Sequence, residues 1–152
     1  MKRKIYIFVA FLLTLIMSVA CLVACEKDGE TKAVSLEQVA QTMVVMKVTE
    51  AEENATALSA LTKLKEEGLI KFTAVDGAYG AYITSINGKE EISSGTSGYS
   101  WMLYTSDTEF SSTEYGAVEY NGVSYGQASL GASSLIVKAG HLYIWAYTEW
   151  SY

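Results

Sequence analysis

The sequence predicts an α+β fold, in which one amphipathic helix packs on mainly antiparallel β-strands. Two observations favour this class. Apolar residues recur at helical spacing over one segment, between residues 54 and 68. Most later segments alternate apolar and polar residues and end in Asn-Gly or other glycine-containing turns, which is typical of short strands joined by hairpins. A chain of 152 residues can bury one core, so we expect a single domain.

The first 24 residues differ in composition from the rest of the chain. A basic start at residues 2–4 precedes an apolar run over residues 5–20, and Leu22-Val23-Ala24-Cys25 resembles a bacterial lipobox. In that class of signal peptide the cysteine receives a diacylglycerol and becomes the new N-terminus. We therefore expect lipidation at Cys25. The alternative is an uncleaved transmembrane anchor with an ordinary cysteine, because the apolar run is long enough to suggest a membrane-spanning helix.

Cleavage before Cys25 would give an extracytoplasmic protein that is attached to the cell membrane by its lipid. Two acyl chains give stable anchoring, at about 0.8 kcal/mol per buried methylene. The chain has a net charge of −6, and loss of the three cations at residues 2–4 makes the remainder more acidic. No basic cluster is left in the sequence, so nucleic acid is not an expected partner.

A polar stretch separates the signal from the first apolar strand. We expect residues 25–41 to be the lipid anchor and a tether, in which Ser35 could cap a short helix that reaches Gln41. The folded domain is then expected over residues 42–152. Its first strand would span residues 42–48, with three core-facing side chains: Val44, Met46 and Val48.

The amphipathic helix comes next. Asn54 can cap its start, and Gly68 stands where a helix ends. Between them runs an apolar stripe that we expect to pack on the sheet: Ala57, Leu58, Leu61 and Leu64. The alternative is a helix that presents this stripe to a partner protein.

The remaining segments are predicted to be strands and turns. The strands are expected at residues 69–75, 79–86, 99–104, 135–137 and 142–150, with a hairpin over 118–123. Turns are expected at Asp76-Gly77, Asn87-Gly88 and Asn121-Gly122, and small-residue loops at 89–98 and 126–134. The chain contains no proline, so its sheet edges need another form of protection.

Alternation assigns side chains to the two faces of three strands. Ile83 is expected on one face, and Tyr82, Thr84 and Ile86 on the other. One face of the later tryptophan strand should carry Tyr99, Trp101 and Leu103. In the last strand, Leu142, Ile144 and Ala146 alternate with Tyr143, Trp145 and Tyr147.

One of these strands also carries a family resemblance. The run Tyr79-Gly80-x-Tyr82-Ile83-Thr84-Ser85-Ile86-Asn87-Gly88 resembles a run in the C-terminal β-domain of the cobalamin carriers transcobalamin and intrinsic factor. That domain is related to a bacterial surface domain labelled DUF4430. Two later stretches resemble the tryptophan strand and the final strand of the family: Tyr99–Tyr104 and Ala139–Tyr147. The resemblance covers residues 42–150 and implies a transcobalamin β-domain-like fold.

The resemblance also implies a function. It suggests non-catalytic binding of a corrinoid or cobalamin-like compound. In the carriers a large helical domain supplies the other half of the cobalamin site, and this chain has no room for one. The resemblance therefore implies that a partner, such as another surface protein, completes the site.

Aromatic residues are the main candidates for ligand contact. All three tryptophans and all tyrosines except Tyr6 lie from Tyr79 onwards. Trp101 and Trp145 are expected in the core, since tryptophan buries a large apolar surface. The candidate ligand-binding residues are Tyr79, Tyr82, Tyr99 and Tyr104. Two alternatives remain open: an adhesion or assembly module that binds protein or glycan through its tyrosines, and tyrosines present for their β-propensity alone.

Catalytic and metal-binding chemistry have weaker support. The chain has one histidine, His141, and no nucleophile-elbow pattern, so an enzyme is not expected. Asp107-x-Glu109 offers two carboxylates that could ligate a hard cation, but the calcium-loop pattern is absent and a solvated polar loop is the alternative. No cofactor is expected with certainty.

Overall fold

The computed structural model describes residues 32–78 and 80–152, which form one compact unit from Lys32 to Tyr152. The expected signal peptide, Cys25 and Tyr79 lie outside the described residues. Within these residues no helix has the length and apolar character needed to cross a membrane. The first half of the unit contains β1 (Val34–Ala40), β2 (Met43–Val48), α2 (Ala57–Glu66), β3 (Phe72–Gly77), β4 (Gly80–Ile86) and β5 (Lys89–Glu90). The second half contains β6 (Ile92–Ser93), β7 (Ser97–Thr105), β8 (Ser111–Tyr120), β9 (Val123–Ala128) and β10 (Leu142–Ser151).

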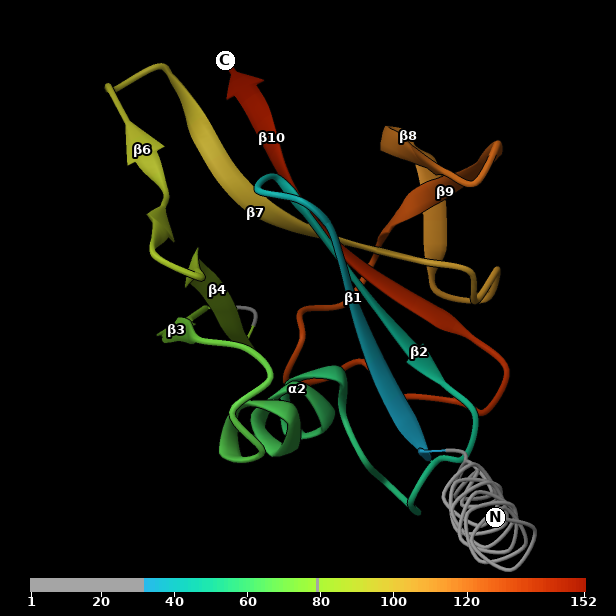
Figure 1. Ribbon diagram of the computed structural model, residues 1–152. Coiled ribbons are helices and arrows are strands. Elements are labelled where there is room, and N and C mark those ends of the chain that lie inside the picture. The colour runs from blue at the N-terminus through green and yellow to red at the C-terminus, as the bar shows by residue number, and fades with distance from the viewer. Residues whose placement is uncertain (1–31, 79) are drawn as a thin grey trace, which may run out of the picture. The chain divides into compact units, whose positions relative to one another are not determined.

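The strands form two antiparallel sheets (Figure 1). The larger sheet has the order β1-β2-β10-β7-β9-β8, and the short strand β6 pairs with β7. The smaller sheet has the order β3-β4-β5. The expected class, a helix packed on mainly antiparallel strands, is therefore confirmed at this level.

The first face of the larger sheet carries the main core. Val44, Met46 and Val48 of β2 are fully buried there, as predicted. Trp145 and Tyr143 of β10 lie in the same cluster, and so does Trp101 of β7. The helix α2 closes this core with four buried side chains: Ala57, Ala60, Leu61 and Leu64. The expected core positions of the two tryptophans are confirmed.

The second face of the same sheet carries a smaller core. Val45, Ile144 and Ala146 are buried on it, together with Tyr104. Val118 of β8 is buried in this cluster, so the β8–β9 hairpin covers this face. Burial on both faces explains why β2 and β10 are apolar almost throughout.

The helix begins two residues later than predicted. Thr56, rather than Asn54, is the N-cap: its hydroxyl accepts a hydrogen bond from the Ser59 backbone at 3.1 Å, and the Ser59 hydroxyl accepts one from the Thr56 backbone at 2.8 Å. Asn54 instead has a φ of 61°, whereas an N-cap residue is normally extended. The predicted end is confirmed, since Gly68 has a φ of 77° and follows the C-cap Glu67.

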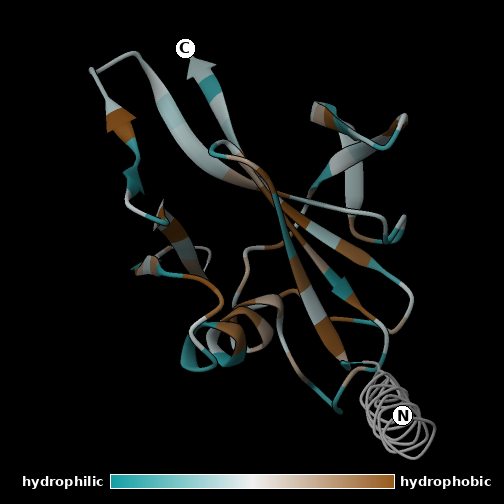
Figure 2. Cartoon of the chain, viewed as in Figure 1, coloured by the Kyte–Doolittle hydropathy of each residue, from teal (hydrophilic) through white to brown (hydrophobic). Residues whose placement is uncertain are grey.

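The N-terminal boundary of the domain differs from the prediction. The short helix expected over Ser35–Gln41 is wrong, because Val34–Ala40 form the strand β1, which pairs with β2. Val34 and Leu36 alternate and pack against the main core, which is a period of two rather than 3.6. Figure 2 shows this alternation along β1 as hydrophobic segments separated by a paler one. The later part of the expected tether thus belongs to the folded unit.

A β-bulge changes the faces predicted for β4. Thr73 pairs with Ser85 and Ala74 pairs with Ile83, so Thr84 is skipped in the register of the two strands. The extra residue reverses the alternation, and both Ile83 and Ile86 are buried in the main core. The prediction that Ile86 faces away from Ile83 is therefore wrong.

The two Asn-Gly turns are confirmed. Asn87 and Gly88 have φ values of 48° and 85° between β4 and β5, and Asn121-Gly122 joins β8 to β9 in the same way. Both central residues of a type I′ turn need positive φ. Three other expectations are wrong: Asp76-Gly77 ends β3, the loop at 89–98 contains β5 and β6, and residues 135–137 form only a single bridge between Thr56 and Ile136.

The edge strand β8 is interrupted. Ser112 pairs with Gln127 and Ala117 pairs with the adjacent Gly126, so the four residues 113–116 bulge out of the ladder. Gly116 has a φ of 120°, and Tyr115 beside it is 73% exposed. At Gly126 a β-carbon would lie 2.8 Å from the Ser112 backbone, so only glycine fits opposite the bulge.

Candidate functional site

A cavity of about 200 Å³ lies where the main sheet meets β4 and the loop after β9. Its aromatic lining comes from three elements: Tyr82 of β4, Trp101 of β7 and Trp145 of β10. The loop from Ser129 to Ala132 also lines it, and every residue of this loop except Leu130 is small. This combination of aromatic side chains and a small-residue loop can receive a flat or apolar group.

The two tryptophans form a rigid part of the lining. Trp145 is 1% exposed and Trp101 is 5% exposed. The indole nitrogen of Trp101 donates a hydrogen bond to the Lys89 carbonyl at 2.9 Å, which fixes its ring. Tyr82 and Leu130 are the exposed parts, at 47% and 37%. A ligand would therefore meet mainly the exposed side chains of Tyr82 and Leu130, and the buried indoles form the rigid wall behind them.

The loop after β9 is held against β4 by a hydrogen bond between a serine side chain and the β4 backbone. The Ala81 N–H donates a hydrogen bond to the Ser133 hydroxyl at 2.9 Å. A β-carbon at Gly80 would lie 2.4 Å from that hydroxyl, and Gly80 has a φ of 99°. Glycine at this position therefore allows the loop to approach the strand that carries Tyr82.

The structure brings only part of the predicted ligand set to this cavity. Tyr82 lines it, and Tyr79 lies outside the described residues. Tyr99 lies elsewhere on β7, 40% exposed, with its ring stacked on Tyr147 at a centroid distance of 5.5 Å. Tyr104 is 3% exposed in the smaller core on the second face, so it offers no surface to this cavity. The alternation that places Trp101 and Leu103 on the first face predicts the opposite face for Tyr104.

Sequence reasoning placed a small-residue loop at 126–134 but named none of its residues as contacts. Gln127, Leu130 and Gly131 all line the cavity. The only sequence signal for them is the run of small residues beside aromatic strands. Their position depends on the contact of the loop with β4, which no local pattern encodes.

The two carboxylates proposed for a metal instead bind a lysine. The Lys138 ammonium lies 2.8 Å from Asp107 Oδ2 and 2.7 Å from Glu109 Oε2. Burial acts to raise the pKa of Asp107, but hydrogen bonds from Lys138 and from the Glu109 backbone outweigh it and hold that pKa below its ordinary value. The same carboxylates raise the pKa of Lys138. Residues 32–78 and 80–152 contain no group of three side chains arranged to hold a metal ion.

The single histidine is bonded to a serine at the junction of β7 and β10. The Ser106 hydroxyl lies 3.1 Å from His141 Nδ1 and accepts a hydrogen bond from the Leu142 backbone at 2.9 Å. The neighbouring Asp107 carboxylate is bound to Lys138 and to the Glu109 backbone. These contacts join two strand ends, and they do not form the serine–histidine–carboxylate relay of a hydrolase.

Comparison with known proteins adds no relative. No protein-family model, no curated protein and no solved structure matches this chain. The resemblance to the cobalamin carriers and to DUF4430 therefore stays a prediction.

Proposed function

We propose that this chain is a lipid-anchored surface protein whose domain binds a ligand without catalysing a reaction. The observation that carries the proposal is the cavity between Tyr82, Trp101 and the loop at 129–132. It combines buried indole surface with an exposed tyrosine and a small-residue loop, which suits recognition of a flat or apolar group. The family resemblance favours a corrinoid or cobalamin-like compound on a transcobalamin β-domain-like fold.

The size of the cavity supports a shared site. About 200 Å³ is below the range of about 300–1,000 Å³ typical of pockets that enclose a drug-sized ligand. A corrinoid would therefore insert one edge or substituent and leave most of its surface outside. A partner protein at the surface would cover the remainder, as the missing helical half of the carriers implies.

Isothermal titration with cyanocobalamin tests the corrinoid assignment. The protein would comprise residues 26–152, which include the whole compact unit. We expect binding by the wild type and an at least tenfold weaker affinity for Tyr82→Ala. Tyr115→Ala is the matched control, since Tyr115 is 73% exposed on β8 and does not line the cavity.

Two outcomes would overturn this assignment. Absence of heat at millimolar cyanocobalamin, confirmed by equilibrium dialysis, would exclude the corrinoid as a ligand of the domain alone. An equal loss of affinity in Tyr82→Ala and Tyr115→Ala would place any binding outside the cavity.

A different observation supports protein or glycan binding as the second candidate. Tyr99 and Tyr147 stack at an interplanar angle of 12°, and the Lys89 ammonium lies 4.3 Å from the Tyr147 ring centroid. In this aromatic pair on β7 and β10, Tyr99 is exposed and Tyr147 is partly buried, and the exposed ring is suited to pack on a sugar ring or a partner side chain. Loss of glycan-array or cell-surface binding in Tyr99→Ala, with Tyr82→Ala unaffected, would favour this candidate.

The lipid anchor has a separate test. Cys25→Ser should abolish radiolabelled-palmitate incorporation and release the chain from membranes. The anchor would be contradicted if the wild type incorporated no palmitate and the Cys25→Ser variant remained uncleaved and membrane-bound.

A further inference from the structure

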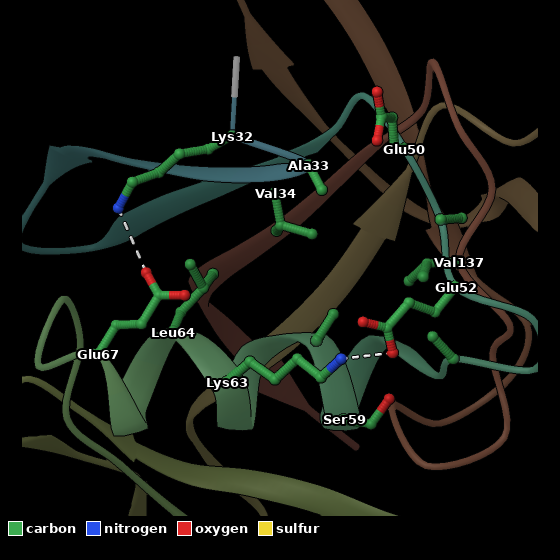
Figure 3. A pocket seen from close by; sticks show the side chains of 13 residues that line it. Lys32, Ala33, Val34, Glu50, Glu52, Ser59, Lys63, Leu64, Glu67 and Val137 are labelled. Carbon is green, nitrogen blue, oxygen red and sulfur yellow. Dashed lines mark hydrogen bonds and ion pairs between the residues drawn. The ribbon is translucent and has the colours of Figure 1, made fainter. Parts of the chain in front are cut away.

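A second cavity, of about 250 Å³, lies between α2 and the start of β1 (Figure 3). Its floor is apolar: Val34 comes from β1, Ala60 and Leu64 from α2, and Val137 from the segment before β10. Leu64, Ala60 and Val137 are 1%, 3% and 3% exposed, so the floor is the surface of the main core itself. An apolar group placed here would add directly to that core.

Small side chains create the space. Alanine occupies positions 33, 51, 55 and 60 of the lining, and Ser59 faces the cavity from the first turns of α2. Each of these side chains is too short to fill the gap between the helix and β1. The hollow is therefore set by the residues of three separate segments, and not by one flexible side chain.

Two ion pairs join charged residues that line the cavity, as Figure 3 shows. The Lys32 ammonium lies 3.3 Å from Glu67 Oε2, and Lys63 pairs with Glu52. These pairs match two cations with two anions. Glu50 lines the same cavity and forms no ion pair with any residue in the described ranges. The rim therefore carries one carboxylate in excess.

We propose that this cavity binds a small aliphatic amine. The hydrocarbon chain would lie against Val34, Ala60 and Leu64, and the ammonium would pair with Glu50 at the rim. Apolar burial supplies the affinity, since each methylene removed from water contributes favourably. The excess carboxylate supplies the selectivity, because an alkyl carboxylate of equal length would meet three anions against two cations. This site is distinct from the cavity at Tyr82, with which it shares no lining residue.

Three ligands of six carbons each separate the two contributions: hexylamine, hexanol and hexanoate. Hexylamine and hexanol have the same alkyl chain, and hexanoate has one alkyl carbon fewer. Titration of ¹⁵N-labelled residues 26–152, followed by amide chemical shifts, measures each affinity and locates the site. We expect shifts at the lining residues in the order hexylamine, hexanol, hexanoate. The preference for amine over alcohol should be about twofold to fivefold, the range that an exposed ion pair supports.

Two sets of variants test the roles of the floor and the rim. Glu50→Gln should remove the preference of amine over alcohol and leave hexanol binding unchanged, whereas Glu114→Gln, an exposed carboxylate on β8, should change neither. Ala60→Leu fills the floor and should weaken all three ligands at least fivefold. Ala51→Leu, at an exposed position of the lining, repeats this test with less risk to folding.

The proposal fails if hexanoate binds as tightly as hexylamine, or if the shifts lie away from α2 and β1. It also fails if both alanine variants fold and bind all three ligands as the wild type does. None of these outcomes bears on corrinoid binding at Tyr82, so the two proposals are tested separately.

Discussion

The two faces of the larger sheet are stabilised differently. The first face is covered by α2 and the smaller sheet, and its cluster contains 17 buried residues within the described part of the chain. The second face is covered by the β8–β9 hairpin, and its cluster contains five. The first face is therefore a core of ordinary size, and the second is a thin apolar layer beneath a hairpin.

Polar contacts compensate for the thin layer. One backbone register position, Tyr104 with Gln127, joins β9 to β7. At its far end the hairpin donates a hydrogen bond from the Tyr120 hydroxyl to Glu37 Oε2 of β1 at 2.6 Å. At its near end the connection from β7 is fixed by the Asp107–Lys138 ion pair. Because its apolar layer is thin, we expect the hairpin to open locally at a cost below that of global unfolding.

A substitution in the main core should have the largest effect. Leu61 is fully buried where α2 meets the sheet. Leu61→Ala should lower the free energy of unfolding by about 2–5 kcal/mol, because it removes buried methyl groups and leaves a cavity. Chemical denaturation followed by tryptophan fluorescence measures the change. If Leu61→Ala lowered the free energy of unfolding by less than Val118→Ala does, the assignment of the main core would be contradicted.

The ion pair at the near end of the hairpin should have a smaller, pH-dependent effect. Because the folded state lowers the pKa of Asp107 below its ordinary 3.8, the carboxylate stabilises the fold above that pH and loses its contribution as the pH falls through the folded pKa. Asp107→Asn should cost about 1–2 kcal/mol at neutral pH. The variant should also lose less stability than the wild type between pH 5 and pH 2, as measured by denaturation at each pH. If the free energies of unfolding of the wild type and Asp107→Asn fell in parallel with pH, the role of Asp107 would be refuted.

A truncation beneath the hairpin should act locally. Val118 is 8% exposed over the second face. Val118→Ala should cost about 1 kcal/mol for the methyl groups removed. Hydrogen exchange should accelerate in β8 and β9 and remain unchanged in β2, which is buried on both faces. Equal acceleration in β2, β8 and β9 would show that the two faces unfold as one unit.

The contact at the far end of the hairpin should have the smallest effect. The hydrogen bond from Tyr120 to Glu37, with burial second, raises the pKa of the tyrosine. Glu37→Gln should therefore lower the Tyr120 pKa, measured by NMR titration of the tyrosine ring carbon, and should change the free energy of unfolding by about 0.5 kcal/mol. Glu119→Gln, an exposed neighbour on β8, serves as the control.

The sequence was a good guide wherever local patterns decided the structure. The strict alternation in Leu142–Trp150 predicted both faces of β10, and both Asn-Gly turns formed as expected. It was a poor guide where a partner strand decided. The bulge at Thr84 arises from pairing with β3, and β1 has too few apolar residues to be distinguished from a polar tether.

The candidate site shows the same division. Tyr82 and the small-residue loop were predicted, because aromatic and glycine content are visible in the sequence. The position of that loop against β4 depends on the hydrogen bond between Ala81 and Ser133. These two residues are 52 positions apart in the sequence. Tyr104 was predicted as a contact because tyrosines suit binding surfaces, but the β8–β9 hairpin covers its face of the strand and buries it.

The interrupted edge of β8 has a consequence for pairing with the strands of a second chain. A long regular edge strand is a template on which a second chain can extend the sheet, and proteins commonly use proline to prevent this. This chain has no proline. The four-residue bulge at 113–116 breaks β8 into two short ladders, so a neighbouring strand would find no continuous row of unpaired amides. At this edge of the larger sheet, one irregularity in the backbone therefore removes the template for pairing with a second chain.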